Sequence, residues 1–442
     1  MDFVTEELAA RITNEIEARK DELIQLVSKL VGYPTVSPPA RNSSKIQHYI
    51  NKYLMDLDFK TERWEVYPGD SNVVGILPGD SAEAYKSLII NGHVDVAEVG
   101  DESDWETPPF VLREEGGYLY GRGVADMKGG LAGALLAVKV LKDLNIPLKG
   151  NLQLQSVIGE EVGEAGTLDC TERGYKADFA VVVDTSDLHI EGQGGVITGW
   201  ITIQSTETYH DGLRRKMVHA GGGIHGANAI EKMMKVISGL QELERHWAIT
   251  KQYPGFAPGT NTINPAVIEG GRHAAFVADR CSLWVTVHFY PNENYEQIIK
   301  EIEEHIHLVA QSDPWLRNHP PQFKWGGKSM IMDKGEVFPS LEIDPEHIGT
   351  RLLVKSYRNT LGKKPEIGMS TTVTDAGWLG RAGIPTVIFG PGKLEDAHAI
   401  NEKLEVQQLV DFTKTLAMFM AEWCNTQKEE KEWPFQNGSM KN

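Results

Sequence analysis

Histidines and carboxylates occur beside glycines in four short motifs of this chain. Imidazole nitrogens and carboxylate oxygens are ligands for zinc and for similar divalent ions. The three cysteines are far apart and odd in number, so they predict neither a disulfide framework nor a cysteine metal site. Any metal would therefore be held by histidine and carboxylate. The motifs are Asn91–Asp95 (NGHVD), Gly121–Gly130 (GRGVADMKGG), Gly159–Gly163 (GEEVG) and Gly390–Gly392 (GPG) followed by His398, with Asp184 as a further acidic position.

Each of these residues also has an ordinary structural interpretation. A histidine after a strand, such as His93, is more often a surface or core residue than a ligand. Asp126 is suited to cap a helix that begins at Met127, and the paired acids Glu160 and Glu161 resemble a solvated charge run. Their occurrence together, with the residue types that a two-metal site requires, favours the metal-binding interpretation.

Short apolar runs rich in valine and isoleucine predict the strands that place these motifs. Helical patterns lie between them, notably Gly130–Leu144, which indicates an α/β layer with a largely parallel sheet. Because the motifs follow the runs directly, their polar side chains should gather at the carboxyl edge of the sheet. The runs are Val73–Leu77, Leu88–Ile90, Leu152–Ile158, Phe179–Val183 and Pro385–Phe389, and further helices are expected at 5–32 and Val406–Trp423.

Length and charge limit the class of protein. The chain has 442 residues, which is too long for one ordinary core and suits two domains. Its net charge is −18, so we expect neither a nucleic-acid nor a membrane partner, because both surfaces are anionic. The charged N-terminal segment lacks the apolar centre of a signal peptide. Together with the few cysteines, this predicts a cytoplasmic protein.

The pattern changes between about Gly195 and Trp325. Strand-like segments there surround two helical patterns, which predicts a small α+β module inserted into the larger domain. We expect a discontinuous metal-binding domain at residues 1–194 and 326–442, with the inserted domain at 195–325. The strand-like segments are Thr198–Gln204, Thr262–Ile268 and Ser282–Phe289, and the helical ones are Ala227–His246 and Tyr295–Val309.

The motifs and their order resemble those of the zinc-dependent aminoacylase and carboxypeptidase superfamily, in its acetylornithine deacetylase and succinyl-diaminopimelate desuccinylase branch. The resemblance extends from about residue 20 to 424. It implies a two-domain α/β fold with a mostly parallel mixed sheet flanked by helices, and an inserted ferredoxin-like lid and dimerisation domain. A homodimer formed through that inserted domain is also implied.

The resemblance further implies how two divalent ions would be held. Asp126 would bridge them, His93 and Asp184 would complete the shell of one ion, and Glu161 and His398 would complete the shell of the other. Zinc is the expected metal, with cobalt as the alternative. Two divalent ions bring +4 and the three carboxylates bring −3, which leaves +1 to hold a hydroxide and polarise a carbonyl.

Two more acidic residues have implied roles beside the metals. Asp95 would orient the imidazole of His93, as a ligating histidine normally requires. Glu160 would be the general base that takes a proton from the metal-activated water and passes it to the departing amine. Asp375, in a Thr-Asp turn, is a further acidic residue that we assign to the support of the site.

The inserted domain carries the expected substrate contacts. His219, before a glycine-rich turn, matches a lid motif whose histidine stabilises the oxyanion, often from the other subunit of a dimer; it would also suit a plain flexible loop. His288 stands where the family usually has an arginine that grips an amino-acid carboxylate, and Gly223 replaces a usual proline. Histidine lacks the bidentate fork of arginine. Asn261 and Arg272 are our other candidates for substrate binding.

These departures favour an N-acyl amide without an amino-acid carboxylate. Within the branch, the subgroup of thiamin-salvage deformylases, which act on an N-formyl aminomethylpyrimidine, has similar stretches. Acetylornithine deacetylase is the alternative, followed by a succinyl-diaminopimelate desuccinylase-like enzyme or a dipeptidase or carboxypeptidase; a non-catalytic homologue is a third reading. The similar stretches are Trp105–Phe110, Gly159–Thr167, Trp315–Arg317 and Lys324–Gly327.

Overall fold

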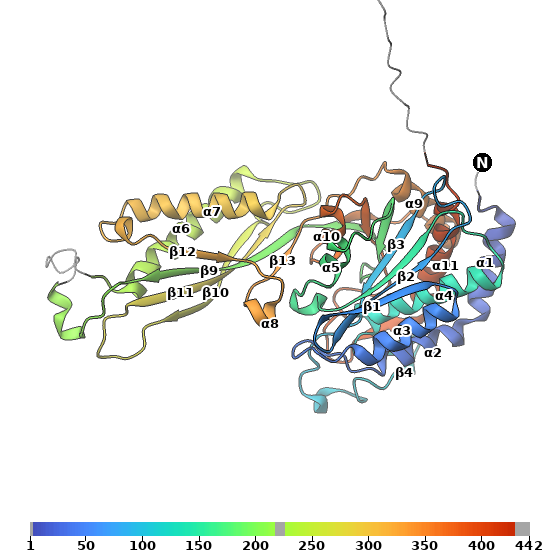
Figure 1. The fold of residues 1–442 in the computed structure, drawn as a ribbon, viewed down its shortest axis with the longest axis horizontal. Coiled ribbons are helices and arrows are strands. Elements are labelled where there is room, and N and C mark those ends of the chain that lie inside the picture. The colour runs from blue at the N-terminus through green and yellow to red at the C-terminus, as the bar shows by residue number, and fades with distance from the viewer. Residues whose placement is uncertain (1–2, 217–225, 429–442) are drawn as a thin grey trace, which may run out of the picture.

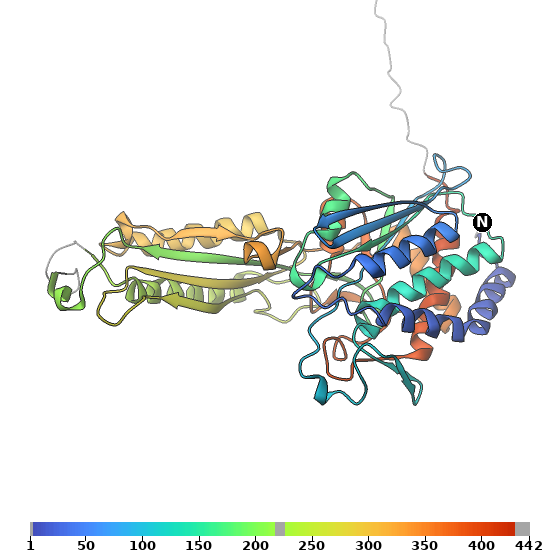
Figure 2. The ribbon, with the colours of Figure 1, turned by 60° about the horizontal axis from the view of Figure 1, so that its bottom comes forward.

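The computed structural model describes residues 3–216 and 226–428. The molecule is elongated, with two lobes that each contain a sheet (Figures 1 and 2). Each lobe also has its own cluster of buried apolar side chains. Within the described residues, no helix combines the length and the apolar character needed to cross a membrane.

The larger lobe is built on an eight-stranded mixed sheet with the order β1-β2-β6-β3-β7-β15-β8-β14. Its centre is parallel: β3 pairs in parallel with β6 and β7, and β7 with β15. This confirms the predicted α/β class. The strands are β1 (Lys60–Tyr67), β2 (Asp70–Leu77), β3 (Leu88–His93), β6 (Leu152–Val157), β7 (Phe179–Val182), β8 (Ile190–Gln193), β14 (Ile367–Ser370) and β15 (Thr386–Ile388).

Helices cover both faces of this sheet. Successive side chains of a strand point to opposite faces, and β3 shows what lies on each. A Cβ on Gly92 would meet Leu131 of α4 and Met127 of the turn before it, whereas Asn91 donates to the Thr167 hydroxyl of α5. The helices are α1 (Glu6–Ala18), α2 (Lys20–Val31), α3 (Ser44–Asp56), α4 (Gly129–Asp143), α5 (Gly166–Glu172), α9 (Ile348–Leu361), α10 (Ala376–Arg381) and α11 (Val406–Trp423).

The N-terminal helix expected over residues 5–32 is in fact two helices, α1 and α2. They are separated at Arg19, whose backbone (φ −104°, ψ 20°) leaves the helical region. The Arg19 guanidinium contacts Glu15 and Asp143, the last residue of α4, which lies at 2.6 Å. The bend lets α1 pack on α11 while α2 packs on α4. A continuous apolar periodicity did not reveal it.

The smaller lobe has the chain order β-α-β-β-α-β and the strand order β10-β11-β9-β12, with every pairing antiparallel. This is the ferredoxin-like arrangement. The short strand β13 (Val337–Phe338), beyond residue 325, also pairs with β9. The elements are β9 (Gly195–Gln204), α6 (Ala229–Thr250), β10 (Thr262–Gly270), β11 (Arg280–Phe289), α7 (Tyr295–Gln311) and β12 (Gln322–Trp325).

The two faces of this smaller sheet differ. Leu283, Val285 and Val287 are buried with the apolar residues of α6 and α7. The alternate positions face the other way, and there Trp200 of β9 stacks on Trp284 of β11 with ring centroids 5.3 Å apart. A third, three-stranded sheet, β16-β5-β4, borders the larger lobe. The remaining elements are β4 (Arg113–Glu115), β5 (Tyr118–Tyr120), α8 (Met330–Asp333) and β16 (Lys403–Glu405).

Candidate metal centre

The polar motifs meet at one edge of the large sheet because β6, β3, β7 and β15 are neighbours and run in parallel. His93 is the last residue of β3, and Glu160 and Glu161 lie in one helical turn after β6. Asp184 follows β7, and His398 lies in the loop between β15 and β16. The carboxyl ends of parallel strands thus bring together residues more than 300 positions apart.

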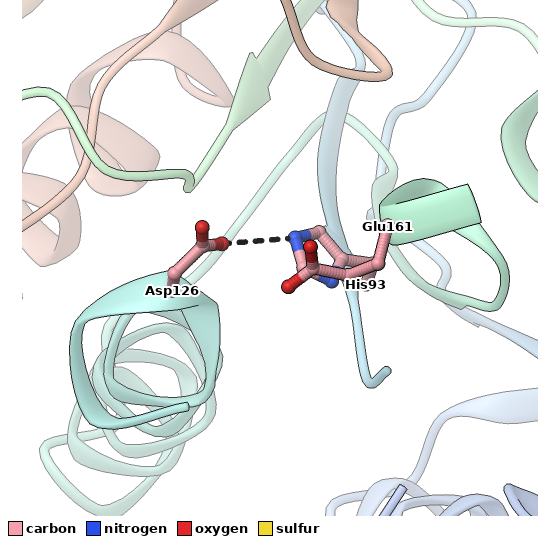
Figure 3. Close-up of side chains that lie close together, drawn as sticks. All are labelled: His93, Asp126 and Glu161. Atoms are coloured by element: carbon pink, nitrogen blue, oxygen red, sulfur yellow. Dashed lines mark ion pairs between the residues drawn. The ribbon is translucent and has the colours of Figure 1, made fainter. Parts of the chain in front are cut away.

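Asp126 occupies the centre of this group. It lies in the irregular turn Val124–Lys128 that precedes α4, and its two oxygens face different histidines. Its Oδ1 is 3.2 Å from Nε2 of His93, and its Oδ2 is 3.2 Å from Nε2 of His398. Figure 3 shows Asp126, His93 and Glu161 pointing toward one another. A carboxylate between two imidazoles is suited to bridge two cations.

The other carboxylates divide between the two histidines. Glu161 Oε2 is 2.9 Å from Nε2 of His398. Asp184 Oδ2 and Glu160 Oε2 lie 3.8 Å and 3.9 Å from Nε2 of His93. The structure thus brings together all five residues proposed as metal ligands and the proposed base, with the grouping that the sequence resemblance implies.

Asp95 supports the cluster mainly through the backbone. Its carboxylate accepts hydrogen bonds from the backbone N–H of Gly159 (2.8 Å) and of Glu161 (3.1 Å), so it fixes the turn that carries the paired glutamates. Nδ1 of His93 lies 3.0 Å from the Asp95 carbonyl oxygen and 3.6 Å from its carboxylate. The imidazole is therefore oriented chiefly by the Asp95 carbonyl.

Burial and mutual repulsion raise the pKa of several carboxyl groups in the cluster. Burial raises the pKa of Glu161 to about 7 and that of Asp184 to about 7, and the charge of Asp126 adds to both. The pKa of Glu160 is raised well above its ordinary value by burial, despite the nearby His93. A bound cation would reverse this tendency, because positive charge favours the ionised form.

The pKa values of the two histidines are also raised, which favours the charged form of each imidazole. Contacts with Asp126 and Glu161 raise the pKa of His398 to about 10. Burial alone would lower the pKa of His93, but its contacts with Asp126 and Asp95 outweigh burial and raise it. Burial likewise opposes ionisation of Asp126, yet the two histidines hold the pKa of that carboxyl below its usual range.

The donor set fits a divalent metal. Ligand atoms of His93, Asp126 and Glu161 lie within 4.8 Å of one another. Nε2 of His93 and Oε1 of Glu161 are both buried without a hydrogen-bond partner, which is uncommon for buried polar atoms. Nitrogen and oxygen donors without thiolates are typical of zinc and related divalent ions.

A recess of about 220 Å³ opens over the cluster. Asp126, Glu160 and Asp184 form one side of it, and the side chain of His398 is 56% exposed. The rest of the wall comes from the segment 372–374 after β14 and from the loop around Leu394. The volume suits a small molecule and a reacting water beside Glu160.

The chain matches the family model described as peptidase family M20/M25/M40 over residues 89–422. It belongs to that family. It is 58% identical to the N-formyl-4-amino-5-aminomethyl-2-methylpyrimidine deformylases of Halalkalibacterium halodurans, covering 96% of this chain and 99% of the relative, and of Bacillus subtilis, covering 95% and 98%. The solved YXEP protein of B. subtilis, described as a dinuclear metal-binding peptidase of the M20 family, matches with TM-score 0.63 and 16% identity, covering 92% and 98%.

Membership in the M20 family confirms the superfamily, the two-lobed fold and the enzyme class, a hydrolase of amide bonds, that the motifs predicted. The family relationship and the donor set agree in pointing to metal-dependent chemistry at this edge of the sheet.

The candidate substrate residues of this M20 chain lie apart from the metal ligands. His219 falls outside the described residues. Asn261 and His288 lie close together, because Thr262 pairs with His288 between β10 and β11. Arg272 follows the other end of β10, where it contacts Asp279 and Thr208. None of these three described residues lines the recess.

Asn261 is the most constrained of the three. It is 1% exposed, and its Nδ2 donates to Glu293 at 2.6 Å, whereas its Oδ1 is buried without a partner. His288 is exposed at the end of β11.

Sequence reasoning missed two buried ion pairs that border the site. Arg41 donates two hydrogen bonds, of 2.6 and 2.7 Å, to the carboxylate of Glu164. Glu164 lies at the end of the turn that holds Glu160 and Glu161. Arg122 pairs with Glu402 beside the turn that holds Asp126. Arg122 lies in the motif Gly121–Gly130 and Glu164 in the stretch Gly159–Thr167, but arginine and glutamate are mostly surface residues, so these patterns gave no reason to expect the ion pairs. Asp375, which the sequence did suggest, is buried and accepts from Thr167 at 2.8 Å.

Proposed function

We propose that this protein hydrolyses the formamide bond of an N-formyl-4-amino-5-aminomethyl-2-methylpyrimidine, releasing formate and the free aminomethylpyrimidine, as a deformylase of thiamin salvage. The observation that carries the proposal is 58% identity to two deformylases of that name over almost the whole chain. The replacement of the usual carboxylate-gripping arginine by His288 supports it, because this substrate has no carboxylate to grip.

Two divalent ions, zinc in preference to cobalt, are the proposed cofactors. His93 and Asp184 would hold one ion, Glu161 and His398 the other, and Asp126 both, in keeping with the contacts of its two oxygens. When bound, such ions polarise a carbonyl and lower the pKa of a water molecule.

Glu160 is the proposed general base. Its carboxylate borders the recess, and Oε2 lies 3.9 Å from Nε2 of His93, so it is left able to face a water. Glu160 takes the proton as the water oxygen attacks the formyl carbon, and it then donates that proton to the amine nitrogen as the C–N bond breaks. Asp95 keeps the turn of Glu160 in place through the two backbone hydrogen bonds described above.

The substrate contacts belong to the inserted lobe. We assign oxyanion stabilisation to His219, and contacts with the pyrimidine to Asn261 and His288. The closeness of the two residues supports their assignment to one contact region, because Thr262 pairs with His288. Arg272 remains a predicted substrate-binding residue; its contact with Asp279 would have to be exchanged for one with the substrate.

A substrate panel tests the activity. Metal-reconstituted protein is offered the N-formyl-aminopyrimidine, its N-acetyl analogue, N-acetylornithine, N-succinyl-diaminopimelate and dipeptides, and formate, acetate, succinate and amine release are measured separately. We expect the highest kcat/KM for the formyl compound. A higher value for acetylornithine would establish the alternative deacetylase, and a preference for dipeptides would establish a peptidase. The Glu160→Ala variant is the blank for contaminating activity.

We further propose a homodimer formed through the inserted lobe, in the cytoplasm. Strand β10 is at one edge of its sheet and exposes Val267 (40%) and Ile268 (53%), and an exposed apolar edge strand favours pairing. Analytical ultracentrifugation should give twice the mass of one chain for the wild type, and the mass of a single chain for Ile268→Lys. The cytoplasmic proposal is supported by Cys170, Cys281 and Cys424, which are all buried and unpaired.

A further inference from the structure

The carboxylate of Glu402, which precedes β16, is fully enclosed and accepts four hydrogen bonds. Its side chain is 0% exposed. Oε2 accepts from Nη1 of Arg122 at 2.8 Å and from the backbone N–H of Gly123 at 3.0 Å. Oε1 accepts from the backbone N–H of Ala125 at 2.8 Å and of Asp126 at 3.1 Å. Three of the four donors therefore lie in, or directly before, the turn that carries the central carboxylate of the metal centre.

Arg122 extends this arrangement to the opposite ligand. Its side chain is 2% exposed, and its Nη2 donates to the carbonyl oxygen of His398 at 3.0 Å and to that of Glu98 at 2.8 Å. His398 has a φ of +60°, a left-handed conformation that is uncommon for a residue other than glycine. The backbone of this ligand is thus held by an external hydrogen bond where its own conformational preference is unfavourable.

We propose that the Arg122–Glu402 pair is the positioning element that fixes the Asp126 turn and the His398 loop at the separation required to bind two metal ions. Neither residue contacts the metal ligands' side chains in the described structure; both act through backbone amides and a carbonyl. The inference rests on the proposed two-metal function. Hydrogen bonds that orient ligands from outside the coordination shell typically account for 10–100-fold in metal affinity.

A buried ion pair that serves stability alone would look different. Such pairs often contribute little net stability, because removing two charges from water is costly. Here one carboxylate accepts from three backbone amides at a turn that carries a proposed ligand, and its arginine donates to the backbone of a second proposed ligand, His398. Asp313 provides a matched comparison in the inserted lobe. It is 1% exposed, contacts Lys232 and Lys235, and accepts from two backbone amides, but it has no connection to the metal centre.

The test compares Glu402→Gln and Arg122→Lys with Asp313→Asn. Metal-free protein is titrated with Zn²⁺ against a chromophoric chelator, and the Co²⁺-loaded protein is examined by visible absorption. Glutamine keeps one carbonyl oxygen but turns an NH₂ group toward the existing donors, so both affinities should fall about 10–100-fold. Lysine keeps the charge but cannot reach Glu402 and the His398 carbonyl together. The affinity for the ion at Glu161 and His398 should therefore fall by at least about tenfold, while the ion at His93 and Asp184 is retained. Asp313→Asn should lower the melting temperature without changing either affinity or the Co²⁺ spectrum.

The inference would be overturned if folded Glu402→Gln and Arg122→Lys had the metal affinities and the Co²⁺ spectrum of the wild type. An equal loss of metal affinity in Asp313→Asn would overturn it as well. If Glu402→Gln does not fold, Arg122→Lys decides, because it retains size and charge. Fewer than two ions bound by the wild-type protein would instead contradict the proposed function, so the two failures are distinguishable. Metal binding is measured without substrate and does not depend on the assignment of the amide.

Discussion

Two adjacent glutamates in one turn have different surroundings in this site. Glu161 contacts His398 at 2.9 Å, whereas Glu160 borders the recess at 3.9 Å from His93. We predict that Glu160→Gln lowers kcat by about 10²–10⁴-fold, because an amide cannot accept the proton of the attacking water. Two metal ions should still bind. Turnover and metal content by atomic absorption check both statements.

The neighbouring variant is the control for that prediction. Glu161→Gln should lose one of the two ions, because it removes an anionic ligand, and should lose activity for that reason. If Glu160→Gln lost metal and Glu161→Gln kept both ions, the assignment of base and ligand would be reversed. Near-normal turnover in Glu160→Gln would contradict the proposed mechanism altogether.

The identity of residue 288 should set the choice between substrates with and without a carboxylate. His288 is exposed at the end of β11 beside Thr262. We predict that His288→Arg raises kcat/KM for N-acetylornithine, relative to the N-formyl-aminopyrimidine, by about tenfold, since a charge-assisted hydrogen bond contributes about 1.5–3 kcal/mol. Thr286→Arg, two residues earlier on the same face, should leave the ratio unchanged. An unaltered ratio in His288→Arg would remove this residue from substrate recognition.

Single residues differed in how well the sequence alone could place them. His93, Asp126 and Asp184 were predictable as neighbours because each directly follows an apolar run or opens a helix, and parallel strands end at a common edge. The Arg122–Glu402 contact was not, because it joins residues 280 positions apart, and the motif around Arg122 does not indicate its partner. The contribution of the Asp95 carbonyl, in place of the carboxylate, depends on the fold of one turn and could not be read from residue type.

The segment that links the lobes packs against the turn that carries the paired glutamates. Glu336, before β13, packs closely on Gly163: a Cβ added to Gly163 would lie 2.5 Å from the Cβ of Glu336. Burial raises the pKa of Glu336 to about 7 from 4.5. The described residues include no cation paired with this carboxylate. Its ionisation is therefore opposed in the folded state.

This carboxylate should make stability pH-dependent. Below about pH 4.5, Glu336 is neutral in both the folded and the unfolded state, so it does not destabilise the fold. Because its folded-state pKa is raised, it destabilises the fold increasingly as the pH rises from about 4.5 to about 7. We predict that Glu336→Gln gains about 1–2 kcal/mol over the wild type at pH 8 but almost nothing at pH 4.5, with the shift discounted for partial exposure. Urea unfolding at both values measures it. The exposed Glu346→Gln should show no such difference, and an equal effect at both values for Glu336→Gln would refute the burial argument.

The positions of helices were predicted better than the points at which one helix is divided from the next. The sequence located α11 at Val406–Trp423 as the structure has it, because its apolar residues are nearly continuous. The division at Arg19 was missed, because the residue types on either side remain helix-forming, while α1 packs mainly on α11 and α2 mainly on α4. Where two helices share one periodic pattern, only the tertiary partners fix the bend.

Within residues 3–216 and 226–428, each of the two lobes (Figure 1) has its own large apolar core, and the core of the larger lobe lies beside the metal centre. This supports the proposed division near residues 195 and 326, although β13 pairs with the inserted sheet from beyond residue 325. Repelling carboxylates at the metal centre should make the larger lobe depend on cations for stability. The smaller lobe, built around residues such as Trp247 and Trp315, should not.

Calorimetry of the full chain tests this separation. We predict two thermal transitions, of which chelator treatment lowers only the one of the larger lobe, by on the order of 10 °C, as expected for removal of a ligand present at about 1,000 times its Kd. Asp313→Asn should lower only the other transition, because Asp313 contacts Lys232, Lys235 and amides within the inserted lobe. The two perturbations together assign each transition. A single transition that both perturbations shift would show that the lobes unfold as one cooperative unit, with metal binding stabilising the entire molecule.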